Sequence, residues 1–381
     1  MVSSVVKSVS PSATISLLNK ENVLKAAGKK VISFSLGEPD FNTPIKILEF
    51  ANEKMMEGYT HYTQSAGIPE LRRKIAEKFS IEKNVKISEK NVLVTPTKFA
   101  LYASYLTLLD PGDEILIPDP GWVSYVEMAH LVGARPIYYK LDENKDYSLD
   151  QEDIKSKINE KTRAIVINTP HNPTGSVLNN DDLNFLRDIS KDKKIFIISD
   201  EIYEKLVFEG NHQSILNDIS LLENLIIVSG FSKSHAMTGL RIGYLISNEE
   251  IVKYVDKIQQ HTLTCAATYS QYAALKALDD DQSPENMRME YKKRRDILYE
   301  GLKDIPAFNV KPPKATFYMY PEINYKGMDS MEFSDYLLEK LYISVVPGIA
   351  FGPSGKYRIR ISFSTGIENI LEGIERLKNL K

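Results

Sequence analysis

The sequence predicts an α/β protein: a mostly parallel central sheet sandwiched by helices in a large domain, plus a smaller α+β domain. Three short runs, at 163–168, 194–199 and 224–229, are rich in β-branched residues and apolar on both faces, which is typical of buried parallel strands. Between the first two, residues 180–193 carry apolar side chains at helical spacing behind an acidic first turn. Strand, helix and strand therefore form the expected repeating unit.

Length and punctuation predict how the chain divides. Its 381 residues exceed what one usual core holds, so we expect two domains. The predicted parts are an N-terminal arm that joins the small domain, a large domain, and a C-terminal small domain, at 1–43, 44–285 and 286–381. A substrate bound between the two domains would be shielded from water when the small domain closes.

Individual elements follow from local signals. Thr43 and Pro44 are the expected N-cap and first residue of a helix that ends at Gly58. The acidic stretch 279–284 precedes a long helical pattern over 287–302. Strand and turn signals mark two later segments, 311–321 and 342–353.

Composition limits the classes of function. Hydrophobic residues make up 43% and charged residues 26% of the chain, as in ordinary globular proteins. The formal net charge of −3 gives no broad attraction to nucleic acid, and the basic run 292–295 is expected to be a solvated helix face. No run approaches the roughly 18 apolar residues needed to span a bilayer. We therefore expect neither a nucleic-acid nor a membrane partner.

Cysteine and histidine usage favours a cytoplasmic protein without a metal. Cys265, the one cysteine, cannot form an intrachain disulfide, which fits a reducing cytoplasm, and it is expected to be a small buried residue. The six histidines show no metal-ligand spacing, so no metal site is expected. Serines and Pro11 interrupt the apolar residues of the N-terminus, so no signal peptide is expected.

The segment 229–244 gives the strongest chemical signal. Within it, Lys233 and Arg241 are separated by small residues. A lysine amine condenses with an aldehyde to form a Schiff base, and an arginine guanidinium binds phosphate oxygens in a bidentate way. Gly239 and Gly243 allow the backbone to come close to a ligand. A lysine and an arginine at this spacing are more often solvated surface residues. Together with the polar motifs that follow apolar runs elsewhere in the chain, however, the segment predicts a pyridoxal-phosphate site.

Polar residues at the ends of the predicted strands strengthen that prediction. Asn172, Asp200 and Lys233 each fall just past one of the three apolar runs. In open α/β sheets, ligands bind outside the carboxyl ends of the strands, so we expect the three side chains to meet there. Taken alone, Asp200 favours a helix cap and the Asn172 motif favours an ordinary turn.

At this point the chain resembles the class I aminotransferases of the fold-type I pyridoxal-phosphate enzymes, above all their prokaryotic aspartate aminotransferase branch. The resemblance spans nearly the whole chain, and the motifs occur in a fixed order. They are PSAT (11–14), LGEPDFNTP (36–44), YTQSAGIPELR (62–72), DPGWVSY (119–125), HNPTG (171–175), DEIY (200–203), the 229–244 segment and RIRISFS (358–364).

The resemblance implies roles for the residues around the cofactor ring. Lys233 would carry the cofactor as a Schiff base and, once released, move a proton from the substrate α-carbon to the cofactor. Asp200 would keep the ring nitrogen protonated, so that the ring accepts electrons. Asn172 and Tyr203 would hydrogen-bond the phenolic oxygen and stabilise its anion. Trp122 would stack on the ring, with core filling as the alternative.

It also implies a phosphate site at the N-terminus of the helix that follows 92–95. The family usually has two small residues there, often including glycine, whereas this chain has Pro96 and is one residue shorter than many relatives. Because proline has no amide hydrogen, Thr97 and the amide of Lys98 are the expected donors, together with Arg241.

Two other positions complete the implied phosphate site. Gly230 stands where many family members carry a phosphate-binding serine, so either Ser229 or Ser232 is expected to compensate. Tyr62 resembles a tyrosine that reaches the phosphate from the neighbouring subunit. The resemblance therefore implies a symmetric homodimer with shared active sites.

For the substrate, the resemblance implies a carboxylate receptor at each end. Strand alternation places Arg358 and Arg360 on one face and does not separate them, whereas the family signature selects Arg360 for the α-carboxylate, next to the backbone amide of Gly37. Trp122 and Asn172 would border the substrate as well. At the other end, the positions that engage a side-chain carboxylate in the matching branch are Ser12, Thr14 and Lys98.

The expected activity is therefore a ping-pong transamination between an L-amino acid, most simply aspartate, and a 2-oxo acid such as 2-oxoglutarate. Broader or aromatic specificity is one alternative, and a pyridoxal-phosphate lyase of the same fold is another, because reaction choice depends on which substrate bond aligns with the ring. A non-catalytic regulator is disfavoured, because the chain has no spare basic helical segment for binding DNA.

Overall fold

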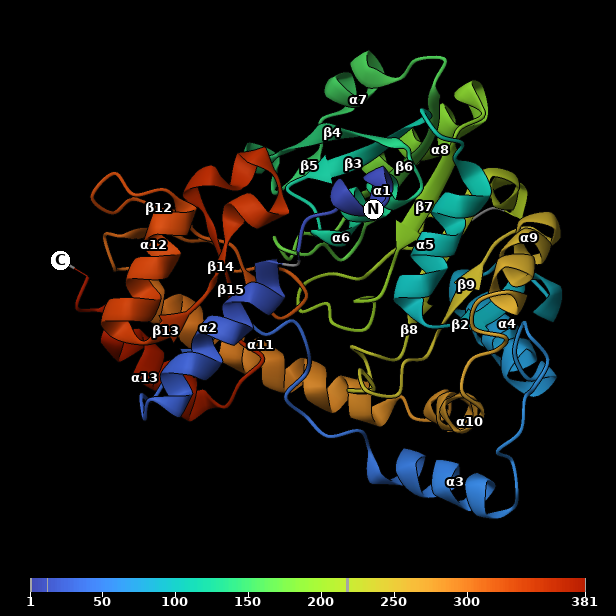
Figure 1. Ribbon diagram of the computed structural model, residues 1–381, viewed down its shortest axis with the longest axis horizontal. Helices are drawn as coiled ribbons and strands as arrows, with labels where there is room; N and C mark the ends of the chain where they lie inside the picture. Colours follow the sequence, from blue (N-terminus) through green and yellow to red (C-terminus); the bar gives the residue numbers. More distant parts are fainter. Residues whose placement is uncertain (1, 12, 217–218, 381) are drawn as a thin grey trace.

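A central sheet runs through the larger part of the molecule (Figure 1). The computed structural model describes residues 2–11, 13–216 and 219–380. Within them the sheet has eight strands, which are, in spatial order, β2 (Val92–Thr95), β9 (Gly243–Ile246), β8 (Leu225–Gly230), β7 (Phe196–Asp200), β6 (Thr162–Asn168), β3 (Glu114–Asp119), β4 (Arg135–Asp142) and β5 (Ser148–Leu149). From β8 to β4 all neighbours are parallel, while β9 and β5 are antiparallel to the strands beside them. The predicted mostly parallel sheet is confirmed.

Alternate residues of the strands pack on opposite faces of this sheet. In β6, Ile165 and Ile167 belong to one core, whereas Ala164 and Val166 belong to the other. The first core includes residues of α4 (Pro69–Lys83), α7 (Gln151–Lys157), α8 (Asn180–Lys193) and α10 (Thr268–Ala277). The second includes residues of α5 (Thr97–Leu108), α6 (Ser124–Leu131) and α9 (Glu249–Gln260). Helices therefore cover both faces, as predicted.

Helix α3 (Ile45–Met56) begins one residue later than predicted. Pro44 occupies the N-cap position, and Thr43 instead donates its hydroxyl to the carbonyl of Ala236 at 2.7 Å. The predicted N-cap is therefore wrong, because a tertiary contact with the loop after Lys233 takes the threonine side chain. The end of the helix agrees with the prediction: Gly58 follows it with a φ of +93°.

A third core lies around two C-terminal helices, α11 (Gln282–Leu302) and α13 (Ile367–Leu377). Short strands complete it: β1 (Ile32–Ser33), β10 (Phe308–Asn309), β11 (Tyr318–Met319), β12 (Glu322–Ile323), β13 (Ile343–Ser344) and β15 (Ile359–Ser362), while β14 (Val346–Pro347) belongs to a smaller neighbouring cluster. Strand β1 pairs parallel with β13, and β15 lies antiparallel between β11 and β14. The other helices here are α2 (Ala13–Ala26) and α12 (Ser330–Tyr336).

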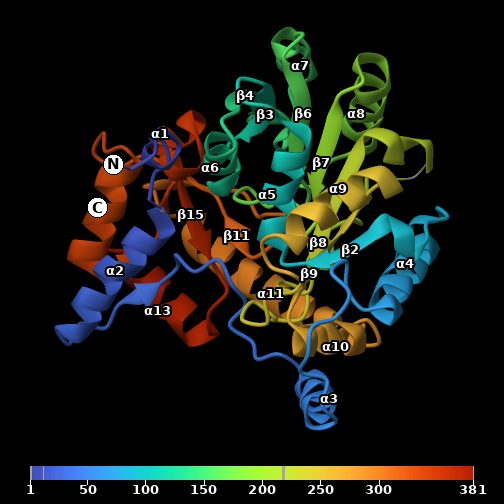
Figure 2. The ribbon, with the colours of Figure 1, turned by 45° about the vertical axis from the view of Figure 1, so that its right-hand side comes forward.

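Helix α2 lies against these C-terminal elements, whereas α1 (Ser4–Lys7) contacts α6 and the backbone N–H of Ser10 donates to Glu127 of α6 at 3.0 Å. Figure 2 shows α2 beside α13, far from the strands of the central sheet. The predicted boundary between residues 285 and 286 falls inside α11, which runs without interruption for 21 residues. The three-part division of the chain stays a prediction.

The basic run 292–295 on α11 is only partly solvated. Lys292 pairs with Asp296, one turn further along the helix, at 3.0 Å. In contrast, Arg294 and Arg295 are only 6% and 4% exposed. Arg294 donates to both carboxylate oxygens of Asp40 at 2.8 Å. The expected solvated face is therefore wrong for half of the run, because buried arginines here neutralise acids from other segments.

Two smaller expectations concern single features. Cys265 is half-buried rather than fully buried, because it lies in the turn between α9 and α10. Among the described residues, no helix is both long and apolar enough to cross a membrane.

Candidate active site

A cavity of about 400 Å³ opens beyond the carboxyl ends of β6, β7 and β8. Most of the predicted site residues line it: Gly37, Thr97, Lys98, Trp122, Asn172, Asp200, Tyr203, Ser232, Lys233, Arg241 and Arg360. Tyr62 does not, and its side chain is 84% exposed. Ser12 and the side chain of Thr14 lie outside the described part of the chain.

Strand register explains why Asn172 and Asp200 meet. The last residues of β6 and β7, Asn168 and Asp200, are direct partners in the parallel ladder. Asn168 donates from Nδ2 to the Asp200 carbonyl at 2.9 Å and accepts the backbone N–H of Asn172 at 2.8 Å. Asn168 was not among the predicted site residues, although its place at the end of a predicted strand was a usable signal.

Asp200 is a buried carboxylate at the floor of the cavity. Its Oδ2 accepts the Tyr125 hydroxyl at 2.7 Å, and its Oδ1 accepts the backbone N–H of Ile202 at 3.3 Å. Burial raises the pKa of Asp200 to about 6, and the bond from Tyr125 opposes that shift. Tyr125 was missed as a site residue, although it stands one helical turn beyond Trp122 in the DPGWVSY motif.

Lys233 extends into the cavity from the turn after β8. Its Nζ donates to the carbonyl of Gly37 at 2.6 Å. Burial lowers the pKa of Lys233 to about 8; Glu38 opposes this shift, and the charge of Arg360 adds to it. The amine therefore loses its proton far more readily than an exposed lysine does.

Arg360 lies opposite and is 2% exposed. It donates from Nη2 to the Ser35 carbonyl at 2.9 Å and from Nη1 to Oδ1 of Asn172 at 3.2 Å. Its Nε is buried and has no partner among the described residues. Arg358, which strand alternation left as an equal candidate, instead pairs with Glu143 at 2.5 Å and does not line the cavity.

The helix N-terminus at the third side of the cavity belongs to α5. Pro96 is its N-cap, so the amides of Thr97 and Lys98 come first and have no partner within the helix. A β-carbon on Gly230 or Gly243 would lie 2.8 or 2.3 Å from Oγ1 of Thr97. Position 230 therefore has no room for the serine that many relatives of the predicted family carry.

Of the two serines expected to compensate, Ser232 lines the cavity, whereas the Ser229 hydroxyl points to the carbonyl of Glu201 at 3.4 Å. Arg241 is exposed at the cavity wall, with a φ of +52°, and donates to the carbonyl of Thr238 at 2.9 Å. Thr238 and Glu38 also line the cavity and share a hydrogen bond of 2.9 Å. Neither had been singled out from the sequence.

Lys98 and Trp122 form one wall together. The Lys98 ammonium lies 4.8 Å from the centre of the Trp122 ring, a cation–π distance. Burial lowers the pKa of Lys98, and the charge of Arg241 lowers it further. Trp122 also packs edge to face on Tyr125, with ring centres 5.3 Å apart. The two interpretations of Trp122 are thus compatible: one side joins a core and the other faces the cavity.

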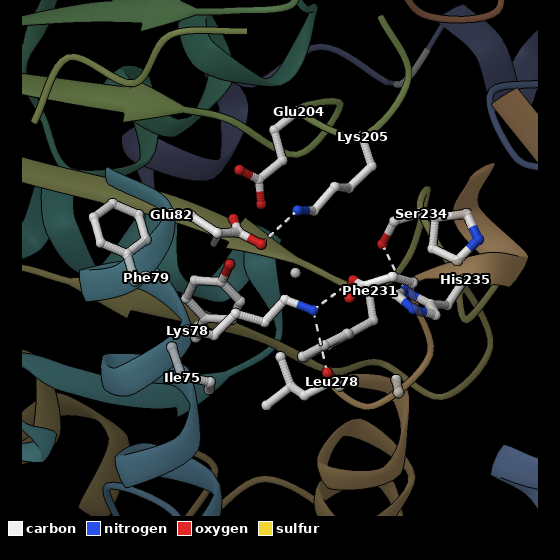
Figure 3. Close-up of a pocket in the computed structure, with 15 residues that line it drawn as sticks. Ile75, Lys78, Phe79, Glu82, Glu204, Lys205, Phe231, Ser234, His235 and Leu278 are labelled. Carbon is white, nitrogen blue, oxygen red and sulfur yellow. Dashed lines mark hydrogen bonds and ion pairs between the residues drawn. The ribbon is translucent and has the colours of Figure 1, made fainter. Parts of the chain in front are cut away.

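A second, much smaller cavity of about 40 Å³ lies behind the turn that carries Lys233 (Figure 3). Its charged side chains are already paired: Lys205 with Glu82 at 2.9 Å, and Lys78 with Asp281 at 2.6 Å. A space of this size holds about one water molecule. We assign it no chemistry.

One group of potential metal ligands was not predicted from the sequence, from which no metal site was expected. Glu201, Glu204 and His212 place ligand atoms within 4.8 Å of one another. Glu204 also pairs with Lys83 at 3.4 Å, and Glu201 accepts hydroxyls from two serines at 2.9 Å. The spacing of these residues along the chain resembles no common metal motif.

The chain is similar to known proteins over most of its length. Residues 29–377 match the family model "Aminotransferase class I and II". The aspartate aminotransferase of Bacillus subtilis is 38% identical over 98% of this chain and 97% of its own length. The structure of the Thermus thermophilus aspartate aminotransferase with maleate superposes with a TM-score of 0.96, at 33% identity and full coverage of both chains. An aromatic aminotransferase of Pyrococcus horikoshii gives a TM-score of 0.89 at 36% identity, covering 95% of this chain and 97% of its own.

Proposed function

We propose that this chain, which belongs to the aminotransferase class I and II family, transfers the amino group of aspartate to 2-oxoglutarate. The protein is an aminotransferase that uses pyridoxal 5′-phosphate. The observation that carries the proposal is the convergence of an amine, an acid and a guanidinium, from Lys233, Asp200 and Arg360, on one cavity.

The described residues fit this cofactor. Asp200 is 4% exposed and has a raised pKa, so a cationic ring nitrogen beside it would relieve the cost of its burial. The free amides at the start of α5, together with Ser232 and Arg241, suit a phosphate dianion. Asn172 and Tyr203 supply the hydrogen bonds for the phenolic oxygen, and Trp122 a face for the ring.

The chain's own groups then divide the work. When bound, the cofactor supplies an aldehyde that takes up amines and a ring that accepts electrons from the substrate α-carbon. Lys233 holds and moves the α-proton at Nζ, and its lowered pKa leaves a useful neutral fraction near pH 7 to 8. Asp200 maintains a negative charge below the ring. Arg360 exchanges its contact with Asn172 for the substrate α-carboxylate, which it binds in a bidentate way.

Lys98 supports the choice of aspartate. It lines the cavity from the first turn of α5, and burial has already lowered its pKa, so a carboxylate partner would restore a favourable environment for its charge. We include Ser12 and Thr14 in this subsite on the resemblance alone. An aromatic donor is the second candidate, because Trp122, Tyr125 and Tyr318 border the same cavity.

A symmetric homodimer is part of the proposal. Tyr62 is 84% exposed in the single chain, which suits a side chain that reaches the phosphate of a second copy. A cytoplasmic location is also part of it, supported by the single cysteine.

Lys233→Ala tests the catalytic centre. The variant should lose the visible absorbance of the lysine-bound cofactor, and kcat should fall by on the order of 100-fold or more, because the proton carrier is gone. Lys257→Ala, which replaces an exposed lysine of α9, serves as the matched control and should keep both the absorbance and kcat. An unchanged spectrum in Lys233→Ala would refute the assignment.

Lys98→Ala tests the substrate. With 2-oxoglutarate as acceptor, kcat/KM for aspartate should fall about tenfold to a hundredfold through loss of a charged hydrogen bond, while kcat/KM for phenylalanine should change little. A wild-type enzyme that prefers phenylalanine over aspartate would favour the aromatic candidate instead.

A further inference from the structure

Tyr318 is a cavity residue that links three parts of the site. It is 1% exposed, and its hydroxyl lies 2.9 Å from the hydroxyl of Tyr203. Its ring centre lies 4.2 Å from the guanidinium carbon of Arg360. A β-carbon on Gly37 would lie 3.3 Å from the same hydroxyl. Tyr318 thus contacts the cofactor side, the carboxylate side and the loop that covers Lys233.

The backbone fixes Tyr318 in this position. Strand β11 pairs with β15 so that Tyr318 faces Ser362, two residues beyond Arg360. The backbone N–H of Tyr318 donates to the hydroxyl of Thr316 at 3.2 Å. Thr316 is fully buried and has a φ of +67°, a strained conformation for a β-branched residue. Strain of this kind persists where the surrounding structure specifies one side-chain direction.

The hydroxyl pair has two possible directions, and the ligand decides between them. When Tyr203 donates its proton to an anionic oxygen in the cavity, its own oxygen is left to accept a hydrogen bond. The Tyr318 hydroxyl is the donor in reach. A chain of donors that ends on an anion is stronger than its separate bonds, because each bond polarises the next.

We propose that Tyr318 is a positioning residue that acts through Tyr203: it donates to the Tyr203 hydroxyl and so strengthens the hydrogen bond from Tyr203 to the phenolic oxygen of the cofactor. This inference rests on the proposed function. It assigns Tyr318 a tuning role separate from the packing of its ring on Arg360.

Tyr318→Phe removes the hydroxyl and keeps the ring. In the proposed arrangement, donated hydrogen bonds draw charge from the phenolic oxygen, so the neighbouring nitrogen contributed by Lys233 holds its proton less tightly. Loss of one donor should therefore raise the pH midpoint of the bound chromophore's absorbance by on the order of half a unit. Inhibition by succinate, which reports the Arg360 end, should stay within about twofold, because the ring remains.

Tyr320→Phe is the matched control: that hydroxyl lies 3.4 Å from the Gly348 carbonyl and outside the cavity, and its midpoint should equal the wild-type value. In a Tyr203→Phe background, adding Tyr318→Phe should shift the midpoint no further. The inference is overturned if Tyr318→Phe titrates like wild type, or if its shift persists undiminished without the Tyr203 hydroxyl. A wild-type protein that forms no lysine-bound chromophore would instead overturn the proposed function itself.

Discussion

Asp200 and Lys233 face each other across the cavity with pKa values that burial has moved toward neutrality, to about 6 and about 8. Each is costly to the folded protein in its charged form, and each becomes useful only when a ligand of matching charge or reactivity arrives. Burying such groups lowers the free energy of unfolding, and this loss of stability accompanies their function in the site.

Asp200→Asn should remove the energetic cost of burying the carboxylate charge and should also remove most of the activity. The native carboxyl keeps its proton up to about pH 6, whereas the unfolded one releases it near 3.8. Folding stability therefore falls as pH rises through this window, by up to about 3 kcal/mol. The asparagine variant lacks this loss, so in cofactor-free protein its stability relative to wild type should grow between pH 4 and pH 7.

Urea unfolding at the two pH values measures this difference, and a stability gap that does not change with pH would contradict the raised pKa. The same variant should lose most turnover, because removing one partner of a buried ion pair costs about 3 kcal/mol, or about a hundredfold in rate.

The residues of the site were largely predictable because several belong to contiguous motifs at strand ends, where sequence order and spatial order coincide. Tyr318 was not, since its partner Tyr203 is 115 positions away in the chain and nothing in either local segment encodes that contact. Strand alternation alone did not separate Arg358 from Arg360, and the family signature chose Arg360; in the structure Arg360 lines the cavity and Arg358 does not.

At the scale of elements, helix α8 begins and ends where the apolar spacing and acidic first turn predict, and its Asn179 cap with Asp182 forms a capping box. Helix α3 begins one residue later than predicted, because the Thr43 hydroxyl donates to the backbone carbonyl of Ala236 instead of capping the helix. Local signals fix an element boundary when no long-range partner competes for the capping side chain.

Helix α11 gives an element-scale prediction. Arg294→Ala should destabilise the protein by about 3 kcal/mol, because it removes a buried side chain whose Nη1 donates to both carboxylate oxygens of Asp40. Lys292→Ala, on the exposed side of the same helix, should cost less than about 1 kcal/mol. Thermal melting of the two variants compares them directly. Equal losses would mean that the whole basic run behaves as a solvated face after all.

For the molecule as a whole, the proposed shared site makes a mixing experiment decisive. Subunits with Lys233→Ala supply an intact Tyr62, and subunits with Tyr62→Ala supply an intact Lys233. If Tyr62 acts across the interface, each hybrid dimer regains one complete site. Equal mixtures that re-associate at random should then reach about a quarter of wild-type activity above the residual level of the variants. Activity no higher than the average of the two variants would exclude the exchange of this residue.

The overall arrangement was predictable because buried parallel strands, helical spacing and motif order all agreed on one fold class. The pairing of β1 with β13 was not visible in the sequence, since both strands have two residues and no distinctive pattern.

That pairing has a consequence for biosynthesis. Residues 32–33 leave the ribosome before any strand of the central sheet, whereas their partners 343–344 follow after all of them. The adjacent Phe34 is fully buried and packs against Gly373 of α13, so its pocket cannot exist until that helix has been synthesised. The central sheet can therefore assemble on the ribosome before α13 is made, whereas Phe34 stays exposed until α13 packs against it.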